Sequence, residues 1–333
     1  MTTPLKSYPT GVRALLVEEA ARRRRIESRF VAELERAAFA EIVLPIIDYV
    51  EPYAALVDKQ LARQSYRFVD RDGELVTIRS DFTPMVARAL APSLRVSDLP
   101  LKIFYRGDVI RCEASRLGVN RELFQIGAEI LGDDSVEADA GALLLSTAII
   151  AGFGIRPMVV YNDVSIVERI IAFASASTGA SPDIDRAIRS ALVAKRTGEL
   201  AAVRASIPPA ALALIEQLAS GEATLASLAN FEATADAARR LESIERATRD
   251  AANGDFILHL DDIDESPGYY TGLRFRIYDA GTRSRIAQGG RYDSLYQRFG
   301  FPAAAIGFTF TIDDLDEREL NATTATAQTG EAR

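Results

Sequence analysis

Residues 105–132, YRGDVIRCEASRLGVNRELFQIGAEILG, hold two apolar stretches with a polar loop between them. The stretches LKIFYRGDVIRC (101–112) and ELFQIGAEI (122–130) are short and rich in β-branched and aromatic residues, which predicts two strands. Gln125 and Glu129 stand four residues apart in the second strand. Because strand side chains alternate between two faces, both should lie on one face.

The face that carries Gln125 and Glu129 is unusually polar for a strand with apolar neighbours. Gly127 lies between them and leaves room for another group to approach. Charges on such a face are costly to bury without partners. The residues alone therefore indicate either a ligand site or a solvent-facing sheet. Two more sets of polar residues are each predicted to share one face of a strand. They are Arg79, Asp81 and Thr83 in TIRSDFTP, and Arg111 and Glu113 in VIRCE.

Outside this region the pattern predicts an antiparallel α+β domain. Residues 11–38 read as an amphipathic helix, and 136–152 as a buried helix. In EIVLPII (41–47), Pro45 cannot donate to a ladder, so that strand should lie at an edge or an interface. Asp72-Gly73 predicts a hairpin turn within YRFVDRDGELVTIRS. The later predicted strands are RPMVVYND, FILHLD, GLRFRIYD, SRIAQGG and AAIGFTFTI.

Composition narrows the classes of function. With 48% hydrophobic residues in 333, a packed core is expected, and a net charge of −8 argues against broad binding to nucleic acid. One cysteine, Cys112, and one histidine, His259, leave no Cys/His metal site and no internal disulfide. His259 alternates with apolar residues, which favours a structural role over a catalytic base. We expect no cofactor, no membrane span and a cytoplasmic location.

Several segments together resemble the class II histidyl-tRNA synthetases, over about residues 10 to 316. Residues 105–132 resemble that family's motif 2, and EIVLPII resembles motif 1, which forms the dimer interface there. The histidine-specific Tyr-Tyr segment is matched by ESPGYYTGLRFRIYD, and motif 3 by GGRYDSLYQRFG with AAIGFTFTIDDL. The resemblance implies a class II synthetase-like antiparallel sheet flanked by helices, with a helical insertion.

The resemblance also implies a domain organisation and a binding pocket. The pocket would hold histidine, with acids for the ammonium group, an arginine for the carboxylate, and tyrosines and a glutamine around the imidazole. The predicted regions are the first synthetase-like part (1–163), the helical insertion (164–250), the second synthetase-like part (251–318) and a disordered tail (319–333). The implied pocket residues are Asp81, Thr83, Arg111, Gln125, Glu129, Tyr269 and Tyr270.

Departures from the synthetase pattern fall where that family holds ATP. Motif 3 normally ends in an arginine, but this sequence has Asp313-Asp314, and Thr311 stands where a glycine is usual. Glu265 aligns with a second arginine, four residues before the tyrosine pair. Each lost charge-assisted hydrogen bond costs roughly 1.5–3 kcal/mol. Activation of an amino acid by ATP is therefore expected to fail.

A chain that keeps the amino-acid pocket but lacks the arginines for ATP resembles the regulatory subunits of ATP phosphoribosyltransferase, a family paralogous to the synthetases. The resemblance implies a non-catalytic protein that forms a self-dimer and joins a short-form catalytic subunit, usually in a hetero-octamer, with histidine as effector. The alternative is a synthetase-like enzyme that activates histidine or an analogue for a non-tRNA acceptor. A weaker third hypothesis is a sensor of uncharged tRNA, which the acidic balance disfavours.

Overall fold

The computed structural model divides into two compact units. It describes residues 8–53, 64–112, 120–178, 182–251, 253–263, 269–313 and 315. Unit 1 consists of Met1–Ile130, Tyr296–Phe301 and Thr309–Arg333, and unit 2 of Leu131–Leu295 and Pro302–Phe308. The predicted loop residue Glu113, the acids Glu265 and Asp314, and the predicted tail lie outside the described residues.

Unit 1 contains a main sheet and a small separate sheet. The strands of the main sheet run in the order β1-β5-β6-β11, with β1 and β5 parallel, and the small sheet has the order β2-β4-β3. Its elements are α1 (Val17–Arg36), β1 (Ala40–Glu41), β2 (Ile47–Tyr49), η1 (Glu51–Tyr53), β3 (Arg67–Val69), β4 (Leu75–Ile78), α3 (Thr83–Leu90), η2 (Val96–Asp98), β5 (Leu101–Ile110) and β6 (Glu122–Leu131). Part of β11 (Ala305–Thr311) also belongs to it.

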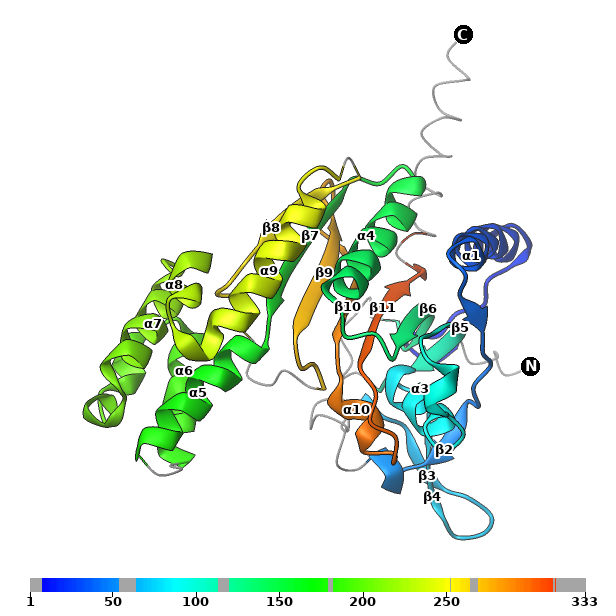
Figure 1. Ribbon diagram of the computed structural model, residues 1–333. Helices are drawn as coiled ribbons and strands as arrows, with labels where there is room; N and C mark the ends of the chain where they lie inside the picture. Colours follow the sequence, from blue (N-terminus) through cyan, green and yellow to red (C-terminus); the bar gives the residue numbers. More distant parts are fainter. Residues whose placement is uncertain are drawn as a thin grey trace, which may run out of the picture. The chain divides into compact units, whose positions relative to one another are not determined.

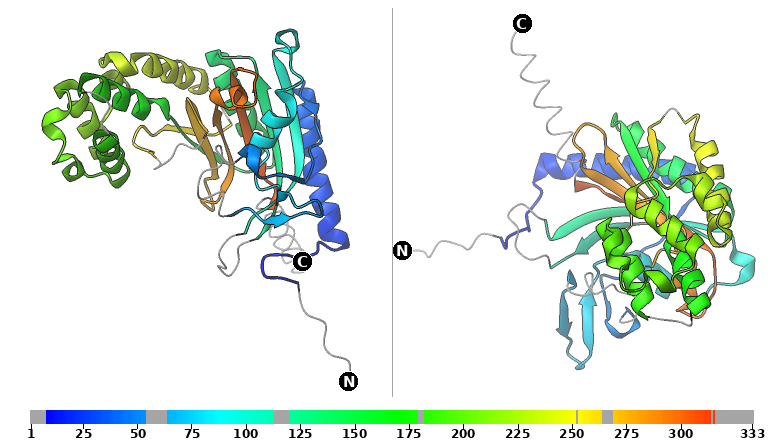
Figure 2. Two further views of the ribbon diagram at one scale, coloured as in Figure 1. Left: turned by 90° about the horizontal axis from the view of Figure 1, so that it is seen from below. Right: turned by 90° about the vertical axis from the view of Figure 1, so that its left-hand side faces the viewer.

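Helix α1 runs alongside the β5–β6 strands (Figure 2). Ile26, Phe30 and Leu34 are fully buried, and the rings of Phe30 and Phe310 lie 4.7 Å apart. This is the apolar stripe that the sequence predicts. The helix begins at Val17 rather than at residue 11, because the chain is still extended at Leu16, which is the N-cap residue.

The predicted strand EIVLPII is wrong as a single element. Only its first residue, Glu41, lies in β1, and only its last, Ile47, lies in β2. Between them the Arg79 guanidinium donates to the carbonyls of Leu44 and Pro45, at 3.2 and 3.3 Å. A side chain therefore takes the carbonyls that a ladder would otherwise pair. As expected for this segment, β1 lies at an edge of the main sheet.

The predicted hairpin is confirmed as β3 and β4. Gly73 occupies the turn with φ 87°, and Phe68 pairs with Val76 across the strands. On the other side of β4, Tyr49 of β2 also pairs with Val76, so the three side chains share one face. Tyr49 and Phe68 are exposed, as is Ile47 on the same face. This sheet face, defined by Ile47, Tyr49 and Phe68, is apolar, and these three side chains are exposed within the described part of the chain although Val76 between two of them is buried.

Unit 2 is built on the strand order β11-β10-β9-β7-β8. Strand β9 pairs antiparallel with β7 and β10, whereas β7 and β8 are parallel, so the sheet predicted as antiparallel is mixed. Its helices are α4 (Val136–Gly152), α5 (Ser165–Thr178), α6 (Pro182–Ala194), η3 (Thr197–Leu200), η4 (Arg204–Ser206), α7 (Pro209–Ser220), α8 (Leu225–Ala229), η5 (Glu232–Thr234), α9 (Ala235–Thr248) and α10 (Ser294–Gln297), which ends in unit 1. Its strands are β7 (Pro157–Asp163), β8 (Asp255–Leu258), β9 (Leu273–Asp279), β10 (Arg285–Arg291) and most of β11.

The helices of unit 2 form two groups. Helices α4 and α9 pack on each other and on the strands β7–β10 (Figure 1). Helix α4 has the predicted bounds of 136–152, and Ser135 caps it by accepting a hydrogen bond from the Ala138 amide at 3.1 Å. Helices α5 to α8 gather beyond the β8 edge with their own core, which includes Ile188, Leu214 and Leu218.

Candidate functional site

A buried carboxyl group, that of Glu129, is the centre of the polar cluster in unit 1. Glu129 is 1% exposed and Gln125 6% exposed, both on β6. The room that Gly127 leaves is filled by Tyr105 of β5, since a Cβ at Gly127 would lie 2.3 Å from the Tyr105 hydroxyl oxygen. The glycine therefore lets the Tyr105 ring cross the face of β6 and reach Glu129.

Two hydroxyl groups donate to Glu129, and a third lies beside one of these two hydroxyl groups. The Tyr105 hydroxyl donates to Glu129 Oε1 at 2.9 Å, and the Thr83 hydroxyl to the same oxygen at 3.2 Å. Thr309 of β11 lies 3.2 Å from the Tyr105 hydroxyl. Burial raises the pKa of Glu129 to about 8, although these hydrogen bonds oppose the rise. Glu129 is thus largely protonated at neutral pH.

Asp81 is a second, half-buried acid in the same unit. Burial raises the pKa of Asp81, and the positive charge of Arg111 lowers it in opposition. Arg111 itself donates from Nε to the Ser80 carbonyl at 3.1 Å. The charge of Asp81 also raises the pKa of Glu129, so the two acids lie near each other. Unit 1 therefore brings together Asp81, Thr83, Arg111 and Glu129 of the predicted pocket.

The predicted common strand face of Arg79, Asp81 and Thr83 is wrong. Strand β4 ends at Ile78, and Thr83 is the first residue of helix α3. Asp81 Oδ1 accepts a hydrogen bond from the Thr83 amide at 3.1 Å, which forms a local turn directly before the helix. Arg79 serves the backbone instead, donating to the Asp108 carbonyl at 2.8 and 2.9 Å. An aspartate shortly before a proline was the available signal for a helix start.

Three tyrosines form an aromatic cluster in unit 2. The rings of Tyr269 and Tyr270 lie 5.0 Å apart, and Tyr292 meets Tyr269 edge-on at 5.6 Å. A Cβ at Gly290 would lie 2.4 Å from the Leu273 carbonyl oxygen and 2.8 Å from the Tyr270 ring, so this position requires glycine. Tyr292 is missing from the predicted pocket residues, although its place directly after Gly-Gly-Arg was a signal. A joint pocket of these tyrosines with the cluster of unit 1 stays a prediction.

Asp313, the first acid of the Asp313-Asp314 pair at the end of the predicted motif 3, has a carboxylate with two partners. Asp313 forms an ion pair with Arg23 of α1 at 2.6 Å, and it accepts a hydrogen bond from the Phe124 amide at 2.8 Å. The Arg23 guanidinium also lies over the Phe124 ring, 5.4 Å from its centroid. Asp313 therefore ties α1, β6 and the end of β11 together within unit 1.

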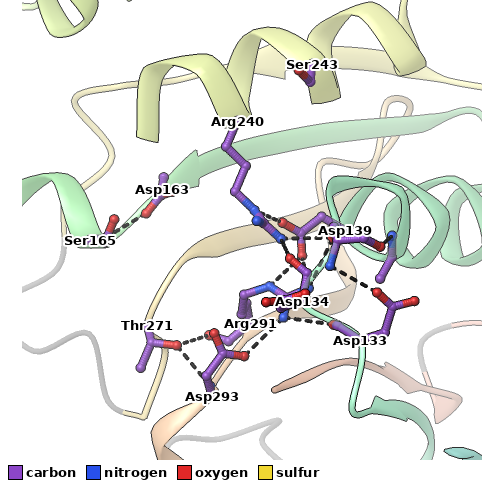
Figure 3. A network of polar contacts seen from close by, with 12 residues as sticks. Asp133, Asp134, Asp139, Asp163, Ser165, Arg240, Ser243, Thr271, Arg291 and Asp293 are labelled. Atoms are coloured by element: carbon purple, nitrogen blue, oxygen red, sulfur yellow. Dashed lines mark hydrogen bonds and ion pairs between the residues drawn. The ribbon is translucent and has the colours of Figure 1, made fainter. Parts of the chain in front are cut away.

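Arginines and an acid form a second buried network, this one within unit 2 (Figure 3). Asp139 of α4 is completely buried and receives hydrogen bonds from Arg291 of β10 and Arg240 of α9. Arg291 reaches the Asp133 carbonyl at 3.1 Å, and Arg240 the Ser135 carbonyl at 2.9 Å. Asp139 thus links helices α4 and α9 with strand β10.

The position of His259 and the search for metal ligands limit the chemistry that the described residues support. His259 lies just after β8 with its side chain 49% exposed, and Nε2 is 3.3 Å from Asp261, so it is neither a buried structural histidine nor part of the Glu129 cluster. Within the described ranges, no group of three His, Cys, Asp or Glu residues could hold a metal ion. Among the described helices, none has the length and apolar character needed to cross a bilayer.

Comparison with known proteins shows where this chain belongs. The family model of histidyl-tRNA synthetase matches residues 11–315. The ATP phosphoribosyltransferase regulatory subunit of Geobacter metallireducens is 34% identical over 315 residues, covering 91% of this chain and 71% of that protein. The one from Carboxydothermus hydrogenoformans is 29% identical, with coverage of 96% and 99%.

Solved structures agree on the fold. A protein of Bacillus halodurans, described as an ATP phosphoribosyltransferase regulatory subunit/histidyl-tRNA synthetase, has a TM-score of 0.79 at 23% identity, covering 95% of this chain and 84% of that one. Apo histidyl-tRNA synthetase of Staphylococcus aureus has a TM-score of 0.60 at 18% identity, covering 93% and 69%. The predicted class II synthetase-like fold is confirmed.

Proposed function

This chain belongs to the ATP phosphoribosyltransferase regulatory subunits, a branch of the histidyl-tRNA synthetase family, and from that premise we propose that it acts without catalysis of its own. It binds a short-form catalytic subunit, activates it, and makes the complex sensitive to histidine in the first step of histidine biosynthesis. One contrast carries the proposal. A buried acidic cluster is kept around Glu129, whereas the sequence has acids, Glu265 and Asp314, at the two positions where synthetases carry arginines for ATP.

The pocket suits the ends of a zwitterion. Glu129 and Asp81 are two acids of unit 1 that could pair with the ammonium group of an amino-acid ligand. Arg111 is a cation whose charge acts on Asp81, and it would take the ligand carboxylate. Gln125 and the pair Tyr269 and Tyr270 would surround the imidazole. For histidine to act as an effector, it must bind the active and inactive states of the complex unequally.

The proposal predicts a gain of activity in a partner enzyme. Adding this chain to a purified short catalytic subunit should raise phosphoribosyl transfer to ATP at least tenfold over the catalytic subunit alone, and histidine should reverse the gain. The measurement is release of pyrophosphate with ATP and phosphoribosyl pyrophosphate, and light scattering should show a complex larger than either component. Histidine-dependent exchange of pyrophosphate into ATP by this chain alone would instead favour the synthetase-like enzyme.

A second prediction concerns self-assembly. The exposed apolar sheet face of Ile47, Tyr49 and Phe68 supports a two-fold dimer, because burying such side chains contributes roughly 1.5–3 kcal/mol each. Phe68→Glu should weaken the dimer at least tenfold, as measured by light scattering over a dilution series. Val69→Glu, on the same strand but the opposite face, is the matched control and should stay dimeric. Equal dissociation of both variants would place the dimer contact elsewhere.

A further inference from the structure

A column of stacked side chains in unit 1 ends on Glu129. The Arg79 guanidinium lies 4.0 Å from the centroid of the Phe82 ring, and this ring is stacked on that of Tyr105 at 4.4 Å with 17° between the planes. The Tyr105 hydroxyl then donates to Glu129 Oε1 at 2.9 Å. Phe82, Tyr105 and Glu129 are each at most 1% exposed, so water does not compete for these contacts.

Two glycines on neighbouring strands make room for this column. A Cβ at Gly107 of β5 would lie 2.8 Å from a guanidinium nitrogen of Arg79 and 3.4 Å from the Phe82 ring. At Gly127 of β6, a Cβ would meet the Tyr105 hydroxyl and ring. Because protein interiors are close-packed, a larger residue at either position would displace a member of the column. The stack and the two glycines together fix where the Tyr105 hydroxyl lies.

The Tyr105 hydroxyl acts on Glu129 as a donor. Burial raises the pKa of Tyr105 well above its usual value, so the hydroxyl keeps its proton at neutral pH. Burial also raises the pKa of Glu129, whereas the hydrogen bonds from Tyr105 and Thr83 lower it, because a donated hydrogen bond favours the charged carboxylate. That charged state is the one that pairs best with an ammonium group.

Asp81 and Tyr296 are the other titratable groups whose charge is coupled to that of Glu129 in the described part of the chain. The charge of Asp81 raises the pKa of Glu129. Tyr296 keeps its proton, because burial raises its own pKa well above the usual value. Both groups are present in wild type and in any variant at position 105, so a difference between the two proteins reports the Tyr105 hydroxyl.

We propose that Tyr105 is a positioning residue of the pocket, whose hydroxyl, held in place by the stack on Phe82 and Arg79, orients the Glu129 carboxylate toward the ammonium group of an amino-acid ligand. The inference rests on the proposed function, because it requires an amino acid at Glu129. Tyr105 is missing from the predicted pocket residues. Its signal was Gly127, since the room predicted there for an approaching group is taken by the Tyr105 ring.

The test removes the hydroxyl and keeps the stack. Tyr105→Phe should bind histidine roughly tenfold more weakly at pH 7, as measured by calorimetric titration. The second readout is the number of protons released per histidine bound, from titrations at pH 8 in buffers with different heats of ionisation. Wild type should release about half a proton, because Glu129 has a pKa of about 8. Tyr105→Phe should release more, since without its donor the acid holds the proton more tightly.

Two further variants complete the test. Phe82→Leu keeps the Tyr105 hydroxyl but removes the ring that holds it, and it should shift affinity and proton release in the same direction as Tyr105→Phe. Tyr161→Phe is the matched control, because Tyr161 is a buried tyrosine of β7 in unit 2, and it should bind and release protons as wild type does.

The remaining outcomes contradict the inference in different ways. If Tyr105→Phe binds histidine as tightly as wild type, the inference is wrong and the proposed function stands. Weaker binding with unchanged proton release would mean that Tyr105 supports the pocket by packing and does not act on the Glu129 carboxylate. If folded wild type binds no histidine, alone or with the catalytic subunit, the proposed site falls and the inference falls with it.

Discussion

Replacing Asp139 with alanine is expected to destabilise the protein by roughly 3–5 kcal/mol, the usual cost of removing one partner from a buried ion pair. Asp139 is 0% exposed, and its carboxylate lies 2.7 Å from a nitrogen of Arg291, itself only 4% exposed. Without Asp139, the Arg291 guanidinium stays buried with Asp293 as its remaining acid partner at 3.1 Å. Arg240 is a quarter exposed and can turn to water, so most of the cost comes from Arg291.

Urea unfolding compares the stability of Asp139→Ala with that of wild type, and both the midpoint and the slope of each transition are recorded. The matched control is Asp183→Ala on α6, which also removes an aspartate from an arginine pair, but one that is about three-quarters exposed on both sides. That change should cost less than about 1 kcal/mol. Asp139→Asn keeps the shape and one acceptor oxygen, and it should fall between the two. A loss below 1 kcal/mol for Asp139→Ala would mean that Arg291 finds other acceptors at little cost.

The sequence predicts those parts of the fold where a local pattern and the tertiary contacts agree. Helix α4 and the β3–β4 hairpin are examples, because a capping serine and a glycine turn mark them. Where a distant side chain decides, the prediction is wrong. Arg79 takes the carbonyls of Leu44 and Pro45 and so interrupts a segment that reads as one strand. No feature of residues 41–47 alone announces that arginine.

The predicted strand positions of the site residues are likewise correct in one segment and wrong in another. Period-two spacing correctly places Gln125 and Glu129 on one buried face of β6. The same period applied to Asp81 and Thr83 is wrong, since Thr83 begins helix α3 and its amide donates a hydrogen bond to Asp81 Oδ1. The partners of Glu129 and Asp139 come from segments tens to hundreds of residues away. Only the folded chain shows that Tyr105 fills the room beside Gly127.

Glu129 makes the stability of this protein depend on pH. Its pKa rises from 4.5 to about 8 because the carboxyl is buried, so the folded chain holds this proton more tightly than the unfolded chain. The stability that the proton contributes is fully present below pH 4.5 and is lost as the pH rises through about 8. A ligand ammonium group would reverse the preference, because it favours the charged carboxylate and expels the proton.

Replacing Glu129 with glutamine should therefore separate stability from binding. Above pH 8 the variant should be more stable than wild type by a few kcal/mol, and this difference should shrink toward pH 5, since one pKa unit corresponds to about 1.4 kcal/mol. Histidine binding should weaken by roughly one to three orders of magnitude, because the charged acceptor is gone. Urea unfolding at pH 5, 7 and 9 and calorimetric titration at pH 7.5 measure the two effects. Glu122→Gln, on the same strand but exposed, is the matched control and should change neither. If Glu129→Gln gains stability at high pH yet binds histidine as tightly as wild type, Glu129 is a buried acid that the effector does not use.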